Sequence, residues 1–477
     1  MASGPVSQPS QTGNSDGKSY TFAFSALTIL FFMWGFLTSL NDILIPHLKA
    51  VFDLSFTQAS LIQFTFFSAY FIMSIPSGKI IEYIGYKNGI VAGLATAGVG
   101  AMMFYPAAAM PSYPLFLAGL FVLATGITIL QVAANPYVSV LGTPSGASAR
   151  LNLSQAFNSL GTTLAPAFGG LLILSATVFT VDQLASMSGD ELATYKALKA
   201  TTVQIPYIGL GITLFIMAGI FAFLKLPTIS EIDEREDHHT FSEALKVPHL
   251  LLGVIAIFVY VGAEVSIGSY LVDFIIEPDI AGLTEKAAAS LVSLYWGGSM
   301  IGRFLGSILM GDAANSSKKN LYIFGIFIFS VIIGWSFTQD LMYTGVFVGF
   351  VALNYILFLV GKGTPGKTLG ILALAASILS FTTIFFFGMT AVWLILSVGL
   401  FNSIMFPTIF TLAIKNLGRL TGKGSSLLIM AIVGGAIIPV MMGFLADNIG
   451  LHKSFFLPAL CYIYIAYYGF KGSDVKA

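Results

Sequence analysis

The sequence predicts an all-α membrane protein with fourteen membrane-spanning helices, arranged as two related halves with an extra pair of helices. Its 477 residues are 56% apolar and only 9% charged, whereas a soluble domain carries about 25% charged residues. The mean hydropathy is +0.87. Apolar residues form long continuous runs, unlike the alternating pattern of barrel strands, and helix-breaking residues recur at matching places in the two parts of the chain.

The charge balance excludes several classes of protein. The chain has 22 basic and 22 acidic residues and a formal net charge of zero, so it lacks the basic excess of a nucleic-acid binder. Its composition does not fit a soluble enzyme or a disordered protein. No nucleophile–base pair or metal-spaced cluster stands out, so we expect no enzyme activity and no cofactor. Cys461 is the one cysteine, which excludes an internal disulfide.

The spans follow a polar N-terminal tail. Residues 1–18 are rich in Ser, Gly, Gln and Pro and lack the features of a signal peptide, so we predict disorder there. A span needs about 20 mostly apolar residues, and it is helical because lipid satisfies no backbone hydrogen bonds. We predict spans at 21–48, 58–82, 88–109, 113–141, 151–175, 205–226, 249–276, 286–311, 319–337, 340–361, 367–388, 390–415, 423–446 and 454–471.

The distribution of Lys and Arg predicts the orientation. With a cytoplasmic N-terminus, 17 of the 22 basic residues fall at the inner ends of the spans and 5 at the outer ends. Cytoplasmic loops of membrane proteins are enriched in Lys and Arg. We therefore predict an even number of spans with both termini in the cytoplasm.

A polar segment divides the chain. It contains a run of acidic residues followed by His238 and His239, but no further metal ligands, so we interpret it as a linker. The predicted organisation is a tail at 1–18, a six-helix bundle at 19–226, a linker at 227–248, a second bundle at 249–471 and a tail at 472–477.

Breaker residues indicate an internal repeat. Asn135-Pro136 matches Phe406-Pro407 at an offset of 271, and Gly161, Pro166 and Gly170 match Gly434, Pro439 and Gly443 at an offset of 273. Paired breakers in two halves are typical of pseudo-symmetric transporters, although Gly and Pro are also common in membrane helices generally.

A third pair of segments gives a different offset. "GKIIEYIGYKNG" after the second span matches "GRFLGSILMGDAANSSKK" after the eighth, which pairs Gly78 with Gly302 at an offset of only 224. The shortfall of about 48 residues predicts an extra helix pair at 319–361 in the second half.

Few ionisable side chains lie within the spans, and such residues are functional candidates by default. Asp42 lies in the outer half of the first span, where it suits cation coupling or a hydrogen bond to a polyol; a structural partnership with Lys49 is the alternative. Glu264 lies centrally in the seventh span, and a structural interhelical hydrogen bond is its alternative. Arg303 is expected at the inner face, with its head group extended toward water.

Amides and aromatic residues accompany these charges. Neutral amides pair well with vicinal hydroxyls, and rings stack on sugars, although helix packing is the alternative for any single ring. The amides are Gln63, Gln131, Asn135, Gln155, Asn158, Asn354 and Asn402, and the rings include Phe36, Tyr70, Tyr260, Tyr295 and Trp296.

Six motifs together resemble the fucose permease and glucose/galactose porter family of the major facilitator superfamily. They are "LNDILIPHLK", "ANPYVSVLG", "RLNLSQAFNSLG", "YVGAEVSIGSYL", "IGRFLGS" and "PTIFTLAIKNLG". The resemblance runs from about residue 20 to the end, apart from 319–361. The loop after the second span also resembles the superfamily signature G-x-x-x-D-R-x-G-R-K. It keeps Gly78, Gly85 and Lys87, has Glu82 at the acidic position, and has Tyr83 and Tyr86 where Arg is usual.

The resemblance implies the major facilitator fold, with two bundles rocking around a midplane sugar site and driven by a cation gradient. The family's functional aspartate corresponds to Asp42, and its asparagine in the fifth helix corresponds to Asn158. Gln131 stands where the fucose permease has a glutamate, which removes a proton relay, and Glu264 is a candidate for the missing charge. This favours glucose or galactose over fucose and makes Na⁺, held near Asp42, a contender against H⁺.

The leading hypothesis, given the resemblance, is a cation-coupled hexose importer that works as a monomer in the lipid bilayer of a bacterial inner membrane. Cation coupling is assigned to Asp42 and Glu264, sugar binding to Asn41, Gln63, Gln131, Asn135, Gln155, Asn158, Glu264, Tyr295, Trp296 and Asn402, and gating to Gly78, Glu82, Gly85, Lys87 and Arg303. The alternatives are an L-fucose–proton symporter, a facilitator of another neutral polyol, a carrier of a drug or organic anion, and a receptor that does not transport. An anion carrier is disfavoured because no Arg or Lys is expected at the midplane.

Overall fold

The computed structural model describes residues 17–54, 56–172, 187–227, 240–311 and 316–475. Within these ranges, some side chains of several helices lie outside the description, among them those of Asn41, Asp42 and Pro166. Residues 1–16 of the predicted tail 1–18, residues 228–239 of the predicted linker 227–248 and residues 476–477 of the predicted tail 472–477 also lie outside it.

The described residues form helices that correspond to the fourteen predicted spans, so the all-α prediction is confirmed. The spanning helices are α1 (Gly17–Phe52), α2 (Phe56–Ala109), α3 (Tyr113–Val140), α4 (Ala147–Leu172), α7 (Gln204–Phe223), α9 (Pro248–Ile276), α10 (Glu285–Leu309), α11 (Ser316–Thr338), α12 (Leu341–Gly361), α13 (Pro365–Thr383), α14 (Gly388–Asn402) with α15 (Met405–Ala413), α16 (Thr421–Met430) with α17 (Gly434–Ile449), and α19 (Phe456–Tyr467). Ten helical stretches within the described ranges are individually long and apolar enough to cross a membrane.

Three helices break where the sequence changes local geometry. α2 contains two spans that meet at Gly85, whose φ of 80° is open to glycine and strained for other residues. A non-helical step separates α14 from α15, and a short 3₁₀ segment, Ala431–Val433, separates α16 from α17.

Short helices outside the spans begin at capping residues. The sequence analysis assigns no helix to α6 (Gly189–Thr201), although Ser188 and Glu191 form a capping box at its start. In the predicted linker, Thr240 caps the five-residue helix α8 (Phe241–Leu245) through the amide of Glu243. α18 (Leu451–Ser454) leads into α19.

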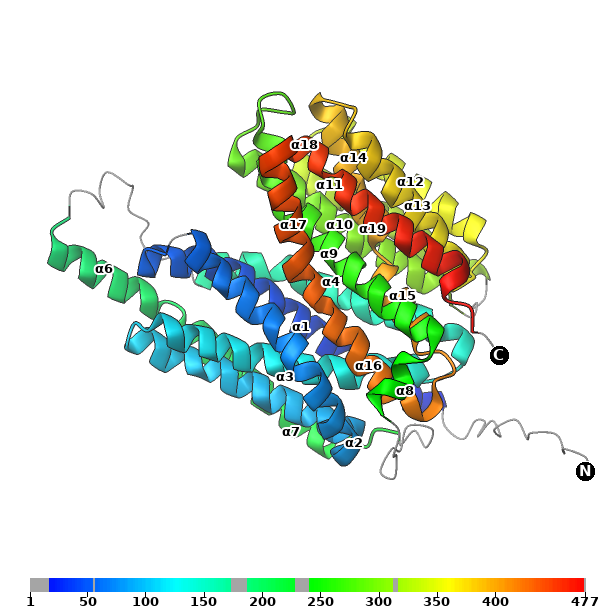
Figure 1. Ribbon diagram of the computed structural model, residues 1–477, viewed down its shortest axis with the longest axis horizontal. Coiled ribbons are helices and arrows are strands. Elements are labelled where there is room, and N and C mark those ends of the chain that lie inside the picture. The colour runs from blue at the N-terminus through cyan, green and yellow to red at the C-terminus, as the bar shows by residue number, and fades with distance from the viewer. Residues whose placement is uncertain (1–16, 55, 173–186, 228–239, 312–315, 476–477) are drawn as a thin grey trace, which may run out of the picture.

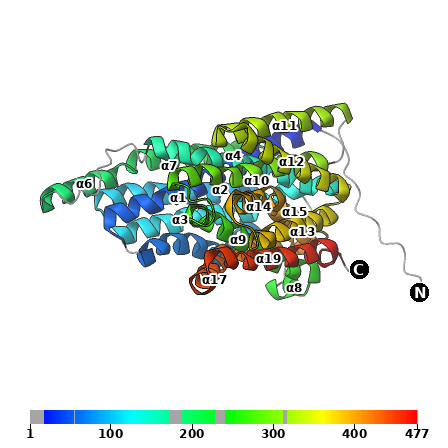
Figure 2. The same cartoon turned by 90° about the horizontal axis from the view of Figure 1, so that it is seen from above.

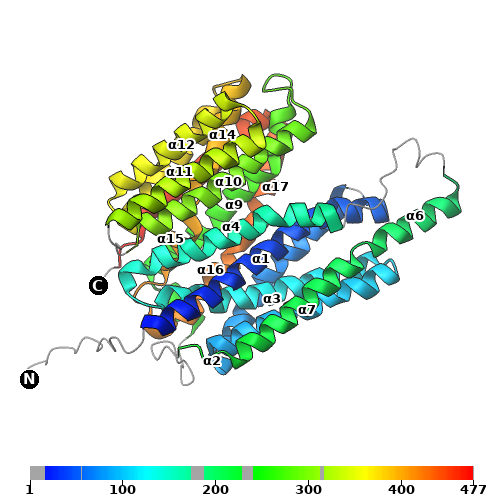
Figure 3. The same ribbon diagram turned by 180° about the vertical axis from the view of Figure 1, so that it is seen from behind.

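The two halves repeat one packing scheme. In the first, α1 packs on α4, and α2 packs on α3 and α7. In the second, α9 packs on α17, α10 on α14, and α13 on α14 and α19. The bundles lie close at the end that carries α8 and α16, and their ribbons diverge toward α6 and α18 (Figures 1 and 3).

A matched pair of glycines shows the repeat at the level of single contacts. Gly161 of α4 lies against the carbonyl oxygen of Phe32 in α1, and Gly434 of α17 lies against the carbonyl oxygen of Phe258 in α9. A side chain at either position would collide with the neighbouring backbone. The breaker pattern in the sequence therefore marks equivalent close crossings of two helices.

The extra helices α11 and α12 pack on each other and on α10, α13 and α14, and α11 lies at the edge of the molecule in Figure 2. Their outward faces expose large apolar side chains, including Phe324 and Trp335, as expected for a surface in contact with lipid. The buried amide of Asn354 donates to the carbonyl oxygen of Leu400 at 3.1 Å. Asn354 therefore attaches the inserted pair to the second half.

Candidate functional site

The halves meet through polar contacts at one end of the molecule. The hydroxyls of Ser148 in α4 and Thr411 in α15 are hydrogen-bonded at 2.7 Å. One helical turn deeper, the amide of Asn152 reaches the hydroxyl of Thr408 at 3.5 Å. The loop that resembles the superfamily signature lies at this same end, since Gly78 of α2 contacts Ser426 of α16.

An ion pair joins the halves beside these contacts. The Nζ of Lys423 lies 3.0 Å from Oε1 of Glu82, and the lysine side chain is only 3% exposed. On the outside of the first half, the ammonium of Lys87 donates to the carbonyl oxygen of Ala222 at 2.7 Å. Of the predicted gate residues, Gly78 and Glu82 therefore contact the other half, whereas Lys87 holds two segments of its own half together.

Arg303 occupies a different place from the expected one. The sequence places its head group at the inner face, but the residue is 8% exposed and lies six residues before the end of α10, about 9 Å from that end. Its Nε donates to the carbonyl oxygen of Ser403 at 3.0 Å. The prediction fails because the guanidinium finds acceptors inside the protein and has no need to extend toward water.

The same guanidinium reaches across to the first half. Its Nη1 donates to the hydroxyl of Ser159 and to the carbonyl oxygen of Gln155, the latter at 3.4 Å. Its Nη2 lies 3.6 Å from Oε1 of Glu264, near the middle of α9. Oε1 of Glu264 also accepts from the hydroxyl of Tyr260 at 2.7 Å. Arg303 thus contacts its own half, the other half and a buried carboxylate.

Two prolines explain why backbone carbonyls are available at this interface. A proline has no N–H, so the carbonyl four residues earlier loses its helical partner. Pro407 frees the carbonyl of Ser403, which accepts from Arg303. Pro136 frees the carbonyl of Val132, which accepts from the hydroxyl of Ser425 in α16 at 3.0 Å. The matched prolines of the repeat therefore create two acceptors close to the contact between the halves.

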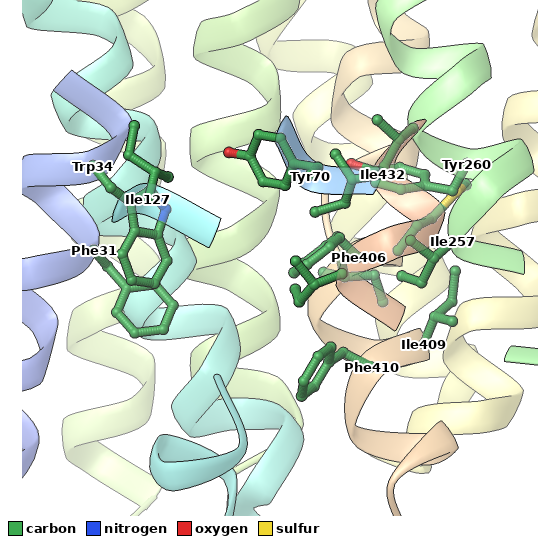
Figure 4. Close-up of a cluster of buried hydrophobic side chains, with 14 of the residues drawn as sticks. Phe31, Trp34, Tyr70, Ile127, Ile257, Tyr260, Phe406, Ile409, Phe410 and Ile432 are labelled. Carbon is green, nitrogen blue, oxygen red and sulfur yellow. The ribbon is translucent and has the colours of Figure 1, made fainter. Parts of the chain in front are cut away.

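Neutral polar side chains face the interior of the first half. Gln131 donates to the hydroxyl of Tyr70 at 2.9 Å. Asn135, one turn further along α3, is 0% exposed, and neither amide atom has a partner. Figure 4 shows Tyr70 between apolar side chains of the first half, such as Trp34, and those of the second half, such as Tyr260. An unsatisfied buried amide is costly, so Asn135 is available for water or a polar ligand.

A second cluster of buried polar groups lies in the second half. The amide of Asn402 donates to the hydroxyls of Tyr295 at 2.9 Å and Tyr462 at 3.1 Å, and its oxygen has no partner. Tyr295 in turn donates to the backbone carbonyl of Glu264 at 3.3 Å. The ring of Trp296 lies edge-on to that of Tyr295, with the ring centres 5.1 Å apart.

The remaining predicted residues are distributed as follows. Asn158 donates to the carbonyl oxygen of Phe31 in α1 at 2.9 Å, so part of its hydrogen-bonding capacity serves the packing of α1 on α4. Gln63 is half-buried in α2. Asn41 and Asp42 lie outside the described side chains, so a Na⁺ site near Asp42 stays a prediction. No cluster of three His, Cys, Asp or Glu side chains suited to a metal occurs in the described part of the chain.

Several interface residues are absent from the predicted set. Ser159, Ser403, Lys423, Ser425 and Tyr462 all contact the groups described above. Sequence signals exist for two of them: Ser159 lies one turn after Gln155, and Ser403 lies four residues before a matched proline. The contacts of Lys423, Ser425 and Tyr462 depend on which helices meet.

Comparisons with known proteins agree with this architecture. Residues 27–364 match the family described as the Major Facilitator Superfamily. A protein named glucose/galactose transporter from Brucella abortus is 47% identical over 469 residues, covering 98% of each chain. The L-fucose-proton symporter of Escherichia coli is 35% identical over 455 residues, covering 94% of this chain and 92% of its own length.

Solved structures give the same result. The crystal structure of the Escherichia coli fucose:proton symporter FucP is 34% identical, with a TM-score of 0.78 over 95% of this chain and 98% of that one. A crystal structure of FucP described as being in the outward conformation has the same identity and TM-score, over 95% and 99%. The chain belongs to the major facilitator superfamily, and within it to the family of the glucose/galactose porters and fucose permeases.

Proposed function

We propose that this protein is a cation-coupled sugar symporter that imports a hexose of the glucose/galactose type by alternating access. One observation carries the proposal: buried polar groups from both halves meet where the halves touch, with Arg303 joining Glu264 to α4. α4 also carries Gln155 and Asn158. The identity to a protein named glucose/galactose transporter supports this sugar class.

Contacts between the halves close one end of the molecule, and this supports an outward-facing state. The contacts Ser148–Thr411, Lys423–Glu82 and Ser425–Val132 all lie at one end. The excess of Lys and Arg predicts that this end is cytoplasmic. With the cytoplasmic end held shut, the site faces outward, as FucP does in the conformation described for it. We place the protein in a bacterial inner membrane with both termini inside.

The chemistry of the site favours a neutral substrate over an organic anion. Arg303 and Lys423 are both buried, and Arg303 lies beside Glu264 near the middle of α9, although no Arg or Lys was expected at the midplane. Each is paired with a carboxylate, Glu264 and Glu82 respectively. A neutralised cation is a poor receptor for a second anion, whereas amides such as Gln131 and Asn135 suit sugar hydroxyls.

The coupling ion is proposed from two residues. Gln131 cannot titrate, so a proton relay of the fucose permease type is unavailable at that position. Asp42 and Glu264 remain as carboxylates for Na⁺ or H⁺. Each charge that enters gains about 2.3 kcal/mol per 100 mV, and coupling requires that sugar and cation favour the same state.

The proposal is tested by uptake into proteoliposomes. Radiolabelled glucose, galactose, mannose and fucose are compared under imposed Na⁺ and pH gradients, with protein-free liposomes as the control. We expect glucose and galactose to accumulate under one gradient and to be released when an ionophore collapses it. Fucose uptake that depends only on a pH gradient would support the L-fucose–proton alternative, and no sugar uptake under any gradient would refute sugar symport.

A further inference from the structure

The guanidinium of Arg303 is divided between two kinds of partner. Ser403 and Glu264 belong to its own half and move with it. Ser159 and the carbonyl of Gln155 belong to the other half. Rocking of the halves leaves the first set in place and separates the second set from the guanidinium. Opening of this end therefore removes two of the acceptors of a buried cation.

A buried cation that loses acceptors is costly unless another group replaces them. Among the described groups around Arg303, the carboxylate of Glu264 can accept a further hydrogen bond from the guanidinium. Its Oε1 lies 3.6 Å from Nη2 of Arg303, longer than the roughly 2.8 Å of a charge-assisted hydrogen bond. Glu264 lies on α9 of the same half, so it remains beside Arg303 when the halves separate.

We propose that Arg303 is a latch that holds the halves together about 9 Å inside the predicted cytoplasmic end, and that Glu264 takes over its guanidinium when the latch releases. In this mechanism the Ser159 hydroxyl stabilises the latched state, and the ionised Glu264 carboxylate stabilises the released state. The inference rests on the alternating-access part of the proposed function. It is independent of which sugar is carried.

The mechanism predicts opposite effects for two substitutions. Ser159→Ala removes an acceptor that exists only when the latch is closed, so it favours release. Glu264→Gln removes the charge that receives the guanidinium, so it favours the latched state. A merely structural role for both residues would move the equilibrium in one common direction or not at all.

The populations are measured by double electron–electron resonance in nanodiscs without sugar. Spin labels are attached to Tyr83→Cys, at a position 85% exposed near the closed end, and to Arg419→Cys, which is exposed on the other half. The background carries Cys461→Ser, because Cys461 is the one native thiol. We expect Ser159→Ala to raise the ratio of long to short distances about fivefold, the low end of typical coupling between sites, and Glu264→Gln to lower it.

Two controls separate the latch from general damage. Ser154→Ala removes a buried hydroxyl of the same helix that has no partner, and it should leave the distances unchanged. Ser159→Thr keeps the hydroxyl and should restore the distribution seen with serine. Shifts in the same direction for Ser159→Ala and Glu264→Gln, unchanged distances in both, or an equal effect of Ser154→Ala would overturn the proposal.

Sugar uptake by the protein with its native Ser159 and Glu264 keeps the two proposals distinct. If the distances respond as expected but no sugar enters proteoliposomes, the latch stands and the proposed substrate is wrong. If sugar is taken up but the distances do not respond, the latch is wrong and the proposed function stands.

Discussion

The two halves share the same backbone features but differ in the polar side chains at their centres. Gly161 and Gly434 make equivalent close crossings, and Pro136 and Pro407 each free a carbonyl that accepts a hydrogen bond. The described polar groups of the first half centre on a neutral pair, Gln131 with Tyr70. Those of the second half centre on a charged pair, Arg303 with Glu264. The comparison teaches that equivalent packing of the two halves does not require equivalent chemistry, since Arg303 and Glu264 both belong to the second half.

The largest expected effect comes from breaking the charged pair. Arg303→Ala leaves Glu264 buried without its cation, and removing one partner of a buried pair costs about 3 to 5 kcal/mol. We expect a marked fall in the thermal unfolding temperature of the detergent-solubilised protein and a loss of uptake.

Two further variants provide the controls for this prediction. Gln131→Ala, in the neutral pair, should cost only about 1 kcal/mol. Adding Glu264→Gln to Arg303→Ala should recover part of the stability, because the unpaired charge is removed. Equal losses for Arg303→Ala and Gln131→Ala would show that the halves do not differ in the way described.

The next effect tests whether the first half contributes a charge of its own. Asp42→Asn should abolish gradient-driven accumulation while leaving some counterflow exchange, because the site still binds sugar but no longer senses the cation. Accumulation and counterflow are measured in proteoliposomes. Unchanged accumulation would remove Asp42 from cation coupling and leave Glu264 as the candidate.

A smaller effect is expected from making the neutral pair titratable. Gln131→Glu places a carboxyl beside Tyr70, so uptake should become more sensitive to pH and should fall as rising pH ionises the new group. Uptake is measured across a pH series at a fixed gradient. Gln131→Leu is the control, since it should reduce uptake at every pH without changing the shape of the profile. An unaltered profile for Gln131→Glu would argue against a lost proton relay.

The smallest effect concerns the carbonyl freed in the first half. Ser425→Ala removes the donor to Val132, a neutral hydrogen bond worth about 1 kcal/mol. The ratio of long to short distances between the spin labels at the closed end should rise severalfold. The rise should be smaller than in Arg303→Ala, which removes every contact of the latch. An effect as large as that of Arg303→Ala would show that the two freed carbonyls are equivalent.

The sequence predicted the features that depend on local signals. The spans follow from runs of apolar residues, and the repeat follows from breakers such as Pro136 and Pro407. The extra pair at 319–361 follows from a change of offset, and it corresponds to α11 and α12. α6 was missed although its capping residues, Ser188 and Glu191, are a readable signal.

The contacts between halves were less predictable because they depend on which helices meet. Arg303 was expected at the inner face, but its acceptors come from α4, α9 and the break after α14. The pairing of Lys423 with Glu82 likewise joins residues that are distant in sequence. The roles of the sugar-binding and cation-coupling residues stay predictions.

The chain enters and leaves the inserted pair of helices at neighbouring points. Gly363, just after α12, lies beside the carbonyl oxygen of Leu309 at the end of α10, where a Cβ atom would be 3.2 Å from that oxygen. A short turn between α10 and α13 would therefore bypass both helices without reversing the direction of any later one. The pair is a self-contained appendage, and its loss would uncover the carbonyl of Leu400 and the flank of α14 to lipid.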